Sequence, residues 1–259
     1  PIYIYIMFFS FIILLKLSLL IGCDHLVSII IPCRDEAENL KTLIPKICEQ
    51  LEQITLNSYE ILILNHASKD STSFLIKHFI ALGINIVEYK YSIFNFKLGN
   101  MLLDGIGHAK GELIITMDGD LSHQPKSLKH IIHAWNQGHD FILGVRYNRN
   151  QIPFNPKQRY ILSKLFNIFA RSVLRIPITD FTTGYRGFSK SLFLKIHRTM
   201  KSKGFEVHLE LNGKLAKSAR DLICIPIEYK KRESGKSKLK YGSELLGYLK
   251  AIFWCFLFK

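Results

Sequence analysis

Two aspartates follow a short apolar run in the middle of the chain. Residues 113–117 read LIITM, which is typical of a strand buried on both faces of a sheet. Asp118 and Asp120 come next, where open α/β sheets bind their ligands. Two like charges this close repel unless a cation lies between them, and Mg²⁺ and Mn²⁺ share carboxylate oxygens with phosphates. The pattern predicts a diphosphate held through a metal ion, although a polar turn in which Asp120 caps the next helix fits the same residues.

The composition narrows the class of protein. The chain has 259 residues, 48% of them apolar, which suits one α/β domain or two small ones. A net charge of +14 at pH 7 indicates an anionic partner such as nucleic acid, anionic lipid or a phosphorylated substrate. No nucleic-acid-binding motif accompanies this charge, so we expect no nucleic-acid partner. The five cysteines form no C-x-x-C pair, which supports neither a zinc site nor a disulfide framework and favours a reducing compartment.

Strands and helices alternate along the chain, and apolar segments lie at both ends. The alternation predicts an α/β fold with a mostly parallel sheet flanked by helices. Residues 1–22 are long and apolar enough for a membrane anchor, with a signal-like segment as the alternative. Residues 23–242 then form the α/β domain, and residues 243–259 an apolar, membrane-associated helix. Residues 157–175 have the pattern of a basic amphipathic helix that lies either in a membrane interface or on the sheet.

The expected strands and helices have the following positions. Apolar runs predict strands at 26–31, 59–64, 84–87, 113–117, 140–145 and 222–227. Helices are expected at 36–53, 72–82, 98–109, after Pro125, at 157–175 and at 205–219, and residues 181–187 are expected to be a loop.

Five motifs occur in the order and spacing of a known family. They are Val27 to Leu40, Met117 to His123, Gly144 to Tyr147, Thr183 to Arg186, and Arg232 to Lys238. Together they resemble family 2 glycosyltransferases with the GT-A (Rossmann-like) fold, and among these the dolichol-phosphate mannosyltransferases and bacterial polyprenol-phosphate sugar transferases. The resemblance covers roughly residues 26–249. It implies inverting transfer of a sugar, most commonly mannose from GDP-mannose, to a dolichyl or polyprenyl phosphate in the membrane, with the catalytic domain on the cytoplasmic face.

The resemblance also implies roles for individual residues. The residues expected to contact the nucleotide are Pro32, Arg34, Glu36, Asn65, Asp118, Gly119 and Lys238, and those expected to bind Mg²⁺ or Mn²⁺ are Asp118, Asp120 and Ser122. The residues expected to bind the acceptor phosphate are Arg146, Arg159 and Ser163. The residues expected to take part in catalysis are Asp118, Asp120, Arg146 and Arg232. Because a lipid phosphate is already anionic near neutral pH, the reaction needs positive charge at the site more than it needs a general base.

Residues 65–68 depart from the family pattern. They read Asn-His-Ala-Ser, where the family usually has two aspartates, glycine and serine. The first of those aspartates reads N–H groups of the nucleobase, and Asn65 keeps an acceptor oxygen but loses the charge, which should weaken base recognition by roughly 1 to 3 kcal/mol. This departure leaves two alternatives open: a UDP-sugar donor such as UDP-glucose, or a catalytically inactive, membrane-anchored binding subunit.

Three other residues invite a functional interpretation. His123 either approaches the diphosphate or packs against the Asp118 loop. Glu206 and His208 are two positions apart on an expected helix, so their side chains point to different faces and a metal cluster is not expected there. The resemblance suggests that Glu206 faces the donor sugar.

Overall fold

The computed structural model describes residues 26–56, 58–92, 96–146, 157–230 and 241–258, and excludes the side chains of residues 157–163 and 241–244. The expected anchor at 1–22 therefore lies outside the described residues. Seven strands form one sheet in the order β3-β2-β1-β4-β6-β5-β7. Their bounds are β1 Val27–Cys33, β2 Tyr59–His66, β3 Ile86–Tyr91, β4 Leu113–Thr116, β5 Phe141–Val145, β6 Arg186–Ser189 and β7 Leu222–Pro226.

All neighbouring strands are parallel except where β6 pairs with β4 and β5. The expected mostly parallel sheet is thus confirmed. The expectation of a loop over 181–187 is wrong at its end, because Arg186 and Gly187 already belong to β6. The segment has a charged residue and a glycine in place of an apolar run, and it becomes a strand because it fills the gap between β4 and β5. As a result, Arg186 pairs with Thr116 at the edge where β4 ends.

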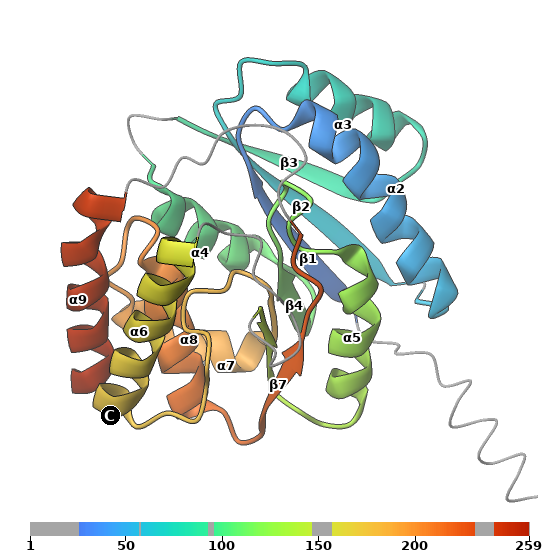
Figure 1. Ribbon diagram of the computed structural model, residues 1–259. Coiled ribbons are helices and arrows are strands. Elements are labelled where there is room, and N and C mark those ends of the chain that lie inside the picture. The colour runs from blue at the N-terminus through green and yellow to red at the C-terminus, as the bar shows by residue number, and fades with distance from the viewer. Residues whose placement is uncertain (1–25, 57, 93–95, 147–156, 231–240, 259) are drawn as a thin grey trace, which may run out of the picture.

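Helices cover both faces of the sheet (Figure 1). Their bounds are α2 Ala37–Gln53, α3 Thr72–Ala81, α4 Leu98–His108, α5 Leu128–Asn136, α6 Lys157–Leu174, α7 Lys190–Ile196, α8 Val207–Ser218 and α9 Tyr241–Leu257, with 3₁₀ turns at Pro125–Ser127 and His197–Thr199. The alternation of side chains along β1 divides the core: Ile29 and Ile31 pack toward α2 and α5, whereas Ile30 packs toward α4 and α8. The two apolar layers hold the carboxyl ends of the parallel strands in place.

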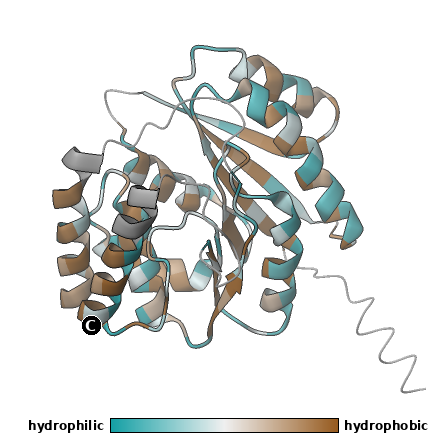
Figure 2. Cartoon of the chain, viewed as in Figure 1, coloured by the Kyte–Doolittle hydropathy of each residue, from teal (hydrophilic) through white to brown (hydrophobic). Residues whose placement is uncertain are grey.

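The last helix, α9, packs against the protein. Ala251 and Cys255 are buried, and Tyr248 meets Phe166 of α6 with 5.5 Å between the ring centroids. Apolar side chains nevertheless remain exposed on the outer sides of both helices, including Leu165, Ile168 and Phe169 on α6 and Leu246, Phe253 and Phe256 on α9, and Figure 2 shows both helices as largely apolar. Among the described residues, no helix combines the length and the hydropathy that crossing a bilayer needs.

Candidate active site

Three residues with left-handed backbone lie just after strands at one edge of the sheet. Asp35 follows β1 (φ 55°), Ala67 follows β2 (φ 48°) and Leu121 follows β4 (φ 62°). None is glycine, so each costs about 1 kcal/mol or more. Strained residues of this kind cluster where a ligand site fixes the backbone. Their shared position agrees with the rule that α/β sheets bind ligands at the carboxyl ends of their strands.

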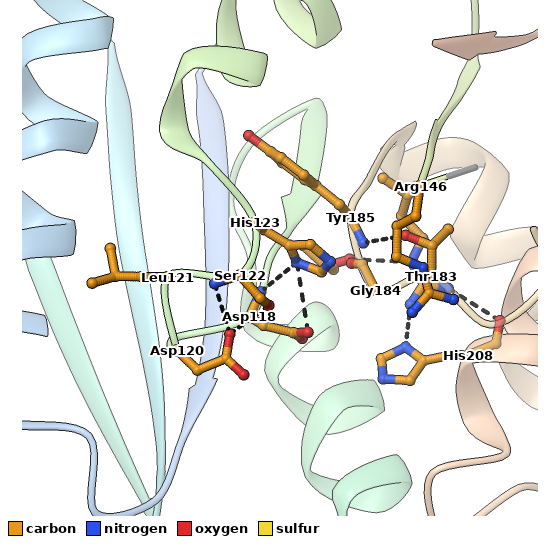
Figure 3. A network of polar contacts seen from close by, with 12 residues as sticks. Asp118, Asp120, Leu121, Ser122, His123, Arg146, Thr183, Gly184, Tyr185 and His208 are labelled. Atoms are coloured by element: carbon orange, nitrogen blue, oxygen red, sulfur yellow. Dashed lines mark hydrogen bonds and ion pairs between the residues drawn. The ribbon is translucent and has the colours of Figure 1, made fainter. Parts of the chain in front are cut away.

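The two aspartates of the central motif lie at this edge, beyond β4 (Figure 3). One oxygen of Asp120, Oδ1, accepts hydrogen bonds from the Ser122 backbone N–H (3.0 Å) and from the Ser122 hydroxyl (2.5 Å). Asp120 is buried, whereas 38% of the Asp118 side chain is exposed. The alternative in which Asp120 caps the following helix is wrong, because α5 begins only at Leu128 and Asp120 bonds within its own turn.

This arrangement fits a hard divalent cation. Within the described part of the chain, no three His, Cys, Asp or Glu side chains gather into a metal site. A metal here would therefore take the carboxylates of Asp118 and Asp120 and complete its shell with hydroxyl, water or phosphate oxygens. Mg²⁺ typically binds in this way, through one or two carboxylates together with substrate phosphates.

His123 packs against the Asp118 loop, which was one of the two interpretations of this residue. Its Nδ1 accepts the Asp118 backbone N–H at 3.0 Å, and its ring stacks on Tyr185 with 5.0 Å between centroids. Burial lowers the pKa of His123, although the charges of Asp118 and Asp120 oppose this shift. The imidazole is therefore neutral at pH 7 and orients the backbone at Asp118.

Gly184 and Arg186 form the wall beside Asp118. A Cβ at Gly184 would lie 3.0 Å from Asp118 Oδ1 and 3.3 Å from His208 Cε1, so a larger side chain would displace these groups. Thr116 donates its hydroxyl to the Gly184 carbonyl at 2.6 Å and accepts Arg186 Nε–H at 3.1 Å. Asn212 accepts from Arg186 Nη1 at 2.6 Å. These contacts hold the backbone of Gly184 against the end of β4.

Arg186 is a buried cation that also fixes His208. Its Nη2 contacts His208 Nδ1, and its Nη1 donates to the His208 carbonyl at 3.3 Å. Burial lowers the pKa of Arg186 to about 9, so it stays protonated at pH 7. Burial, followed by the charge of Arg186, holds the pKa of His208 well below its ordinary value. His208 is therefore neutral, with Nδ1 as acceptor and the proton on Nε2.

Glu206, just before α8, and Glu210, within it, are bonded to groups other than His208. Glu210 is fully buried, pairs with Lys214 Nζ at 2.6 Å, and accepts the Ser202 backbone N–H at 2.7 Å. Glu206 accepts the N–H of Gly204 at 3.0 Å. The carboxylates of Glu206 and Glu210 are thus both engaged by protein groups. The role of Glu206 toward the donor sugar stays a prediction.

Arg146 lies just after β5 and is anchored by a partner that the sequence did not reveal. Its Nε and Nη2 donate to the two carboxylate oxygens of Asp180 at 2.7 and 2.8 Å, and Nη2 donates to the Thr182 hydroxyl at 2.7 Å. Its guanidinium carbon lies 5.5 Å from the centre of the Tyr229 ring. Burial raises the pKa of Asp180, but the charge and hydrogen bonds of Arg146 outweigh burial and leave it below the ordinary value. Arg146 is thus a cation in a fixed orientation.

The loops after β1 and β2 are joined at the same edge. Asp35 accepts the Lys69 backbone N–H at 2.7 Å, and the Glu36 backbone N–H donates to the Thr72 hydroxyl at 3.1 Å. Asn65 is buried at the end of β2 and accepts the Ser68 N–H at 3.0 Å. The residues predicted to line the nucleotide, Pro32, Arg34, Glu36, Asn65 and Gly119, all lie at this edge.

Four predicted site residues are beyond a structural test. Arg159 and Ser163 belong to α6, but their side chains are not described, and Arg232 and Lys238 lie outside the described residues. The residues that sequence reasoning missed are Asp180, Gly184, Arg186 and Asn212. Only the Thr183 to Arg186 motif hinted at them.

Comparisons with known proteins point to one family. A family model described as glycosyl transferase family 2 matches residues 28–196. The chain is 29% identical to the polyprenol monophosphomannose synthase of Mycolicibacterium smegmatis, over 84% of this chain and 82% of that relative. It is 26% identical to the undecaprenyl-phosphate 4-deoxy-4-formamido-L-arabinose transferase of an Enterobacter species, over 84% of this chain but only 63% of that relative.

A solved structure shares the fold. Glucosyl-3-phosphoglycerate synthase of Mycobacterium tuberculosis, solved with Mn²⁺, UDP and glucosyl-3-phosphoglycerate, matches with a TM-score of 0.66 at 14% identity, covering 90% of this chain and 81% of that one. This likeness confirms the GT-A-like architecture.

Proposed function

The chain belongs to glycosyl transferase family 2 and is a glycosyltransferase, and from this premise we propose that it moves mannose from GDP-mannose onto a polyprenyl or dolichyl phosphate. The observation that carries the proposal is the pair Asp118 and Asp120 at the end of β4, with the anchored cation Arg146 at the end of β5. Since β6 lies between these strands, their ends are two strand spacings apart, about 10 Å. The name of the mycobacterial relative supports both the sugar and the acceptor.

The proposed chemistry is a single displacement. An oxygen of the lipid phosphate attacks the anomeric carbon of the sugar, the bond from that carbon to the nucleoside diphosphate breaks, and the configuration inverts. Asp118 and Asp120, with Ser122 beside them, would hold Mg²⁺ or Mn²⁺, which when bound would supply positive charge to the departing diphosphate. The acceptor phosphate needs no general base because it is already anionic.

The chain's own cations bring the two anions together. Arg146 is preorganised by Asp180, so little reorganisation is needed when a phosphate arrives. Arg159 and Ser163, four positions apart in α6, are proposed to share the acceptor phosphate with Arg146. Arg232 and Lys238 are proposed to bind the donor phosphates.

The lipid acceptor implies a membrane-bound enzyme. We propose that residues 1–22 anchor the chain and that the catalytic domain faces the cytoplasm, where nucleotide sugars are made. The exposed apolar side chains of α6 and α9 and the net charge of +14 support contact with an anionic bilayer surface.

A transfer assay tests this proposal. Membranes containing the full chain are given radiolabelled GDP-mannose, UDP-glucose or UDP-N-acetylglucosamine with polyprenyl phosphate, with and without Mn²⁺, and label extracted into organic solvent is counted. We expect metal-dependent labelling from GDP-mannose, and its loss in Asp118→Ala and Asp120→Ala. Labelling from a UDP-sugar alone would replace the proposed donor. No labelling from any donor by folded protein would favour an inactive binding subunit.

A further inference from the structure

Near the end of β2, the amide of Asn65 meets a carboxylate, Glu88, from the middle of the neighbouring strand β3. Glu88 Oε1 accepts hydrogen bonds from Asn65 Nδ2 at 2.7 Å and from the Ser73 hydroxyl at 2.6 Å. Asn65 Nδ2 also donates to Ser73 Oγ at 2.9 Å. Asn65 is 2% exposed, and the Glu88 side chain is 10% exposed. We call Asn65, Ser73 and Glu88 the base-end cluster.

The contacts fix which way the Asn65 amide faces. Its Nδ2 contacts both Ser73 and Glu88 inside the cluster, and its Oδ1 accepts the Ser68 backbone N–H at 3.0 Å. A flipped amide would point its oxygen at the Glu88 carboxylate, which cannot donate a hydrogen bond when ionised. Asn65 therefore contributes no charge to a ligand and holds the Glu88 carboxylate at the end of β2.

Two aspartates at this edge accept backbone N–H groups. Asp35 Oδ1 accepts the Lys69 N–H at 2.7 Å, and Asp70 Oδ2 accepts the Ala37 N–H at 3.0 Å, so these carboxylates hold the two loops together. Glu88 differs because the partners that the structure gives it are side chains. Its second oxygen, Oε2, lies 3.7 Å from the ammonium of Lys90, beyond hydrogen-bond distance.

The position of the cluster suits the base of a nucleotide. β2 and β3 lie two and three strand spacings from β4, about 10 and 14 Å. The residues predicted to line the nucleotide lie at the ends of β1 and β2, so a nucleoside diphosphate with its phosphates at Asp118 and Asp120 would extend its ribose and base in this direction. Nucleobases present N–H donors on their pairing edges, and a carboxylate is an acceptor for them.

Resting on the proposed function, we propose that Glu88 reads the N–H groups of the donor's base and that Asn65 and Ser73 are its positioning residues. The negative charge lost at position 65 relative to the usual family pattern is thus supplied by the neighbouring strand. Guanine offers two adjacent donors, N1–H and N2–H, and Glu88 Oε2, which lies outside the Asn65 and Ser73 hydrogen bonds, is the oxygen that would accept from them. Uracil offers one donor between two carbonyl oxygens, which a carboxylate repels. Glu88 therefore favours guanine over uracil.

Calorimetric binding of GDP, UDP and inorganic pyrophosphate to the full chain in detergent, each with Mn²⁺, tests this inference. Glu88→Gln should weaken GDP binding by about tenfold to a hundredfold, the usual loss for a hydrogen bond to a charged group. It should leave pyrophosphate binding within twofold and reduce the preference for GDP over UDP. Asn65→Asp combined with Glu88→Gln returns a carboxylate to the cluster and should restore most of the GDP affinity.

Glu60→Gln is the matched control. Glu60 is a buried acid at the opposite end of β2 that accepts the Ser28 hydroxyl at 2.6 Å and the Lys110 N–H at 2.7 Å. Its substitution tests loss of a buried carboxylate away from the strand ends and should leave GDP affinity unchanged. If Glu88→Gln weakens GDP and pyrophosphate equally, or weakens neither, the inference is wrong and the proposed function stands. If the unmodified chain binds neither probe with Mn²⁺, the proposed function itself fails.

Discussion

Replacing Gly184 by alanine tests whether Asp118 must keep its observed place. The added Cβ would lie 3.0 Å from Asp118 Oδ1, while the rings of His208 and His123 close the other sides at 3.3 and 3.5 Å. Ordinary contact needs roughly 3.5 Å, so the carboxylate has to move by about 0.5 Å. Metal–ligand distances tolerate only about 0.2 Å. The tightest of these contacts is with Asp118, so we expect the change to act on metal binding mainly through that carboxylate.

The expected losses of stability and of metal affinity follow from the same geometry. Overpacking a filled site costs about 1 to 3 kcal/mol of folding free energy. Disturbing the support of a metal ligand usually weakens metal affinity by about tenfold to a hundredfold. We expect Gly184→Ala to remain folded and to bind Mn²⁺ in the presence of GDP about tenfold to a hundredfold more weakly, as measured by calorimetry.

Gly187→Ala is the control for stability alone. A Cβ there would overlap Ile131 Cγ2 on the other side of β6, so this variant should lose stability without touching Asp118. Denaturant unfolding ranks the two variants by stability, and calorimetry ranks them by metal affinity. If both lose Mn²⁺ affinity in proportion to their loss of stability, or if Gly184→Ala binds Mn²⁺ normally, the reasoning about Asp118 is refuted.

Three further outcomes are expected. Asp180→Asn frees Arg146, so the KM for the lipid acceptor should rise about tenfold while the donor KM stays constant; a change confined to the donor KM in steady-state assays would contradict this. The folded protein keeps His208 neutral while the unfolded chain protonates it, so His208 should lower stability by about 1.4 kcal/mol per pH unit below pH 6.5, in addition to a loss from His123, whose pKa is also lowered; His208→Gln should reduce this slope in denaturant titrations without abolishing it. Lys214→Met leaves the buried Glu210 carboxylate without its cation and should lower the free energy of unfolding by about 3 kcal/mol, whereas the double variant with Glu210→Gln should recover much of this loss. Equal losses in the single and double variants, measured by unfolding experiments, would contradict this prediction.

Most of the parallel strands could be predicted because they are apolar runs, whereas β3, expected at 84–87, lies at Ile86–Tyr91 because Glu88 and Lys90 interrupt its apolar pattern. The strand at Leu113 to Met117 could be predicted from its own residues, and the ligand-binding role proposed for the two aspartates after it was predicted from their position at the end of that strand. β6 was not predicted because its sequence, Arg186-Gly187-Phe188-Ser189, has neither an alternation of apolar and polar residues nor an apolar run. It is a strand only because β4 and β5 leave room for it, and such a tertiary cause leaves no local pattern.

The contacts that position the site residues could not be predicted from the sequence for the same reason. Asp180 binds Arg146 across 34 positions of sequence, and Arg186 reaches His208 across 22. These pairs form because β6 runs antiparallel and brings its first residues to the end of β4. Spacing rules, by contrast, suffice for a pair on one helix such as Glu210 and Lys214, which are four positions apart.

The central claim is that Asp118 and Asp120 hold a nucleoside diphosphate through a divalent metal. Its most direct test is GDP affinity, measured by calorimetry with and without Mn²⁺, for the unmodified chain, Asp118→Asn and Asp120→Asn. Glu52→Gln, an exposed acid near the end of α2, serves as the control. We predict that Mn²⁺ tightens GDP binding in the unmodified chain and the control and has no such effect in the two aspartate variants. GDP affinity that is the same with and without Mn²⁺, or an undiminished Mn²⁺ effect in either aspartate variant, would contradict the claim.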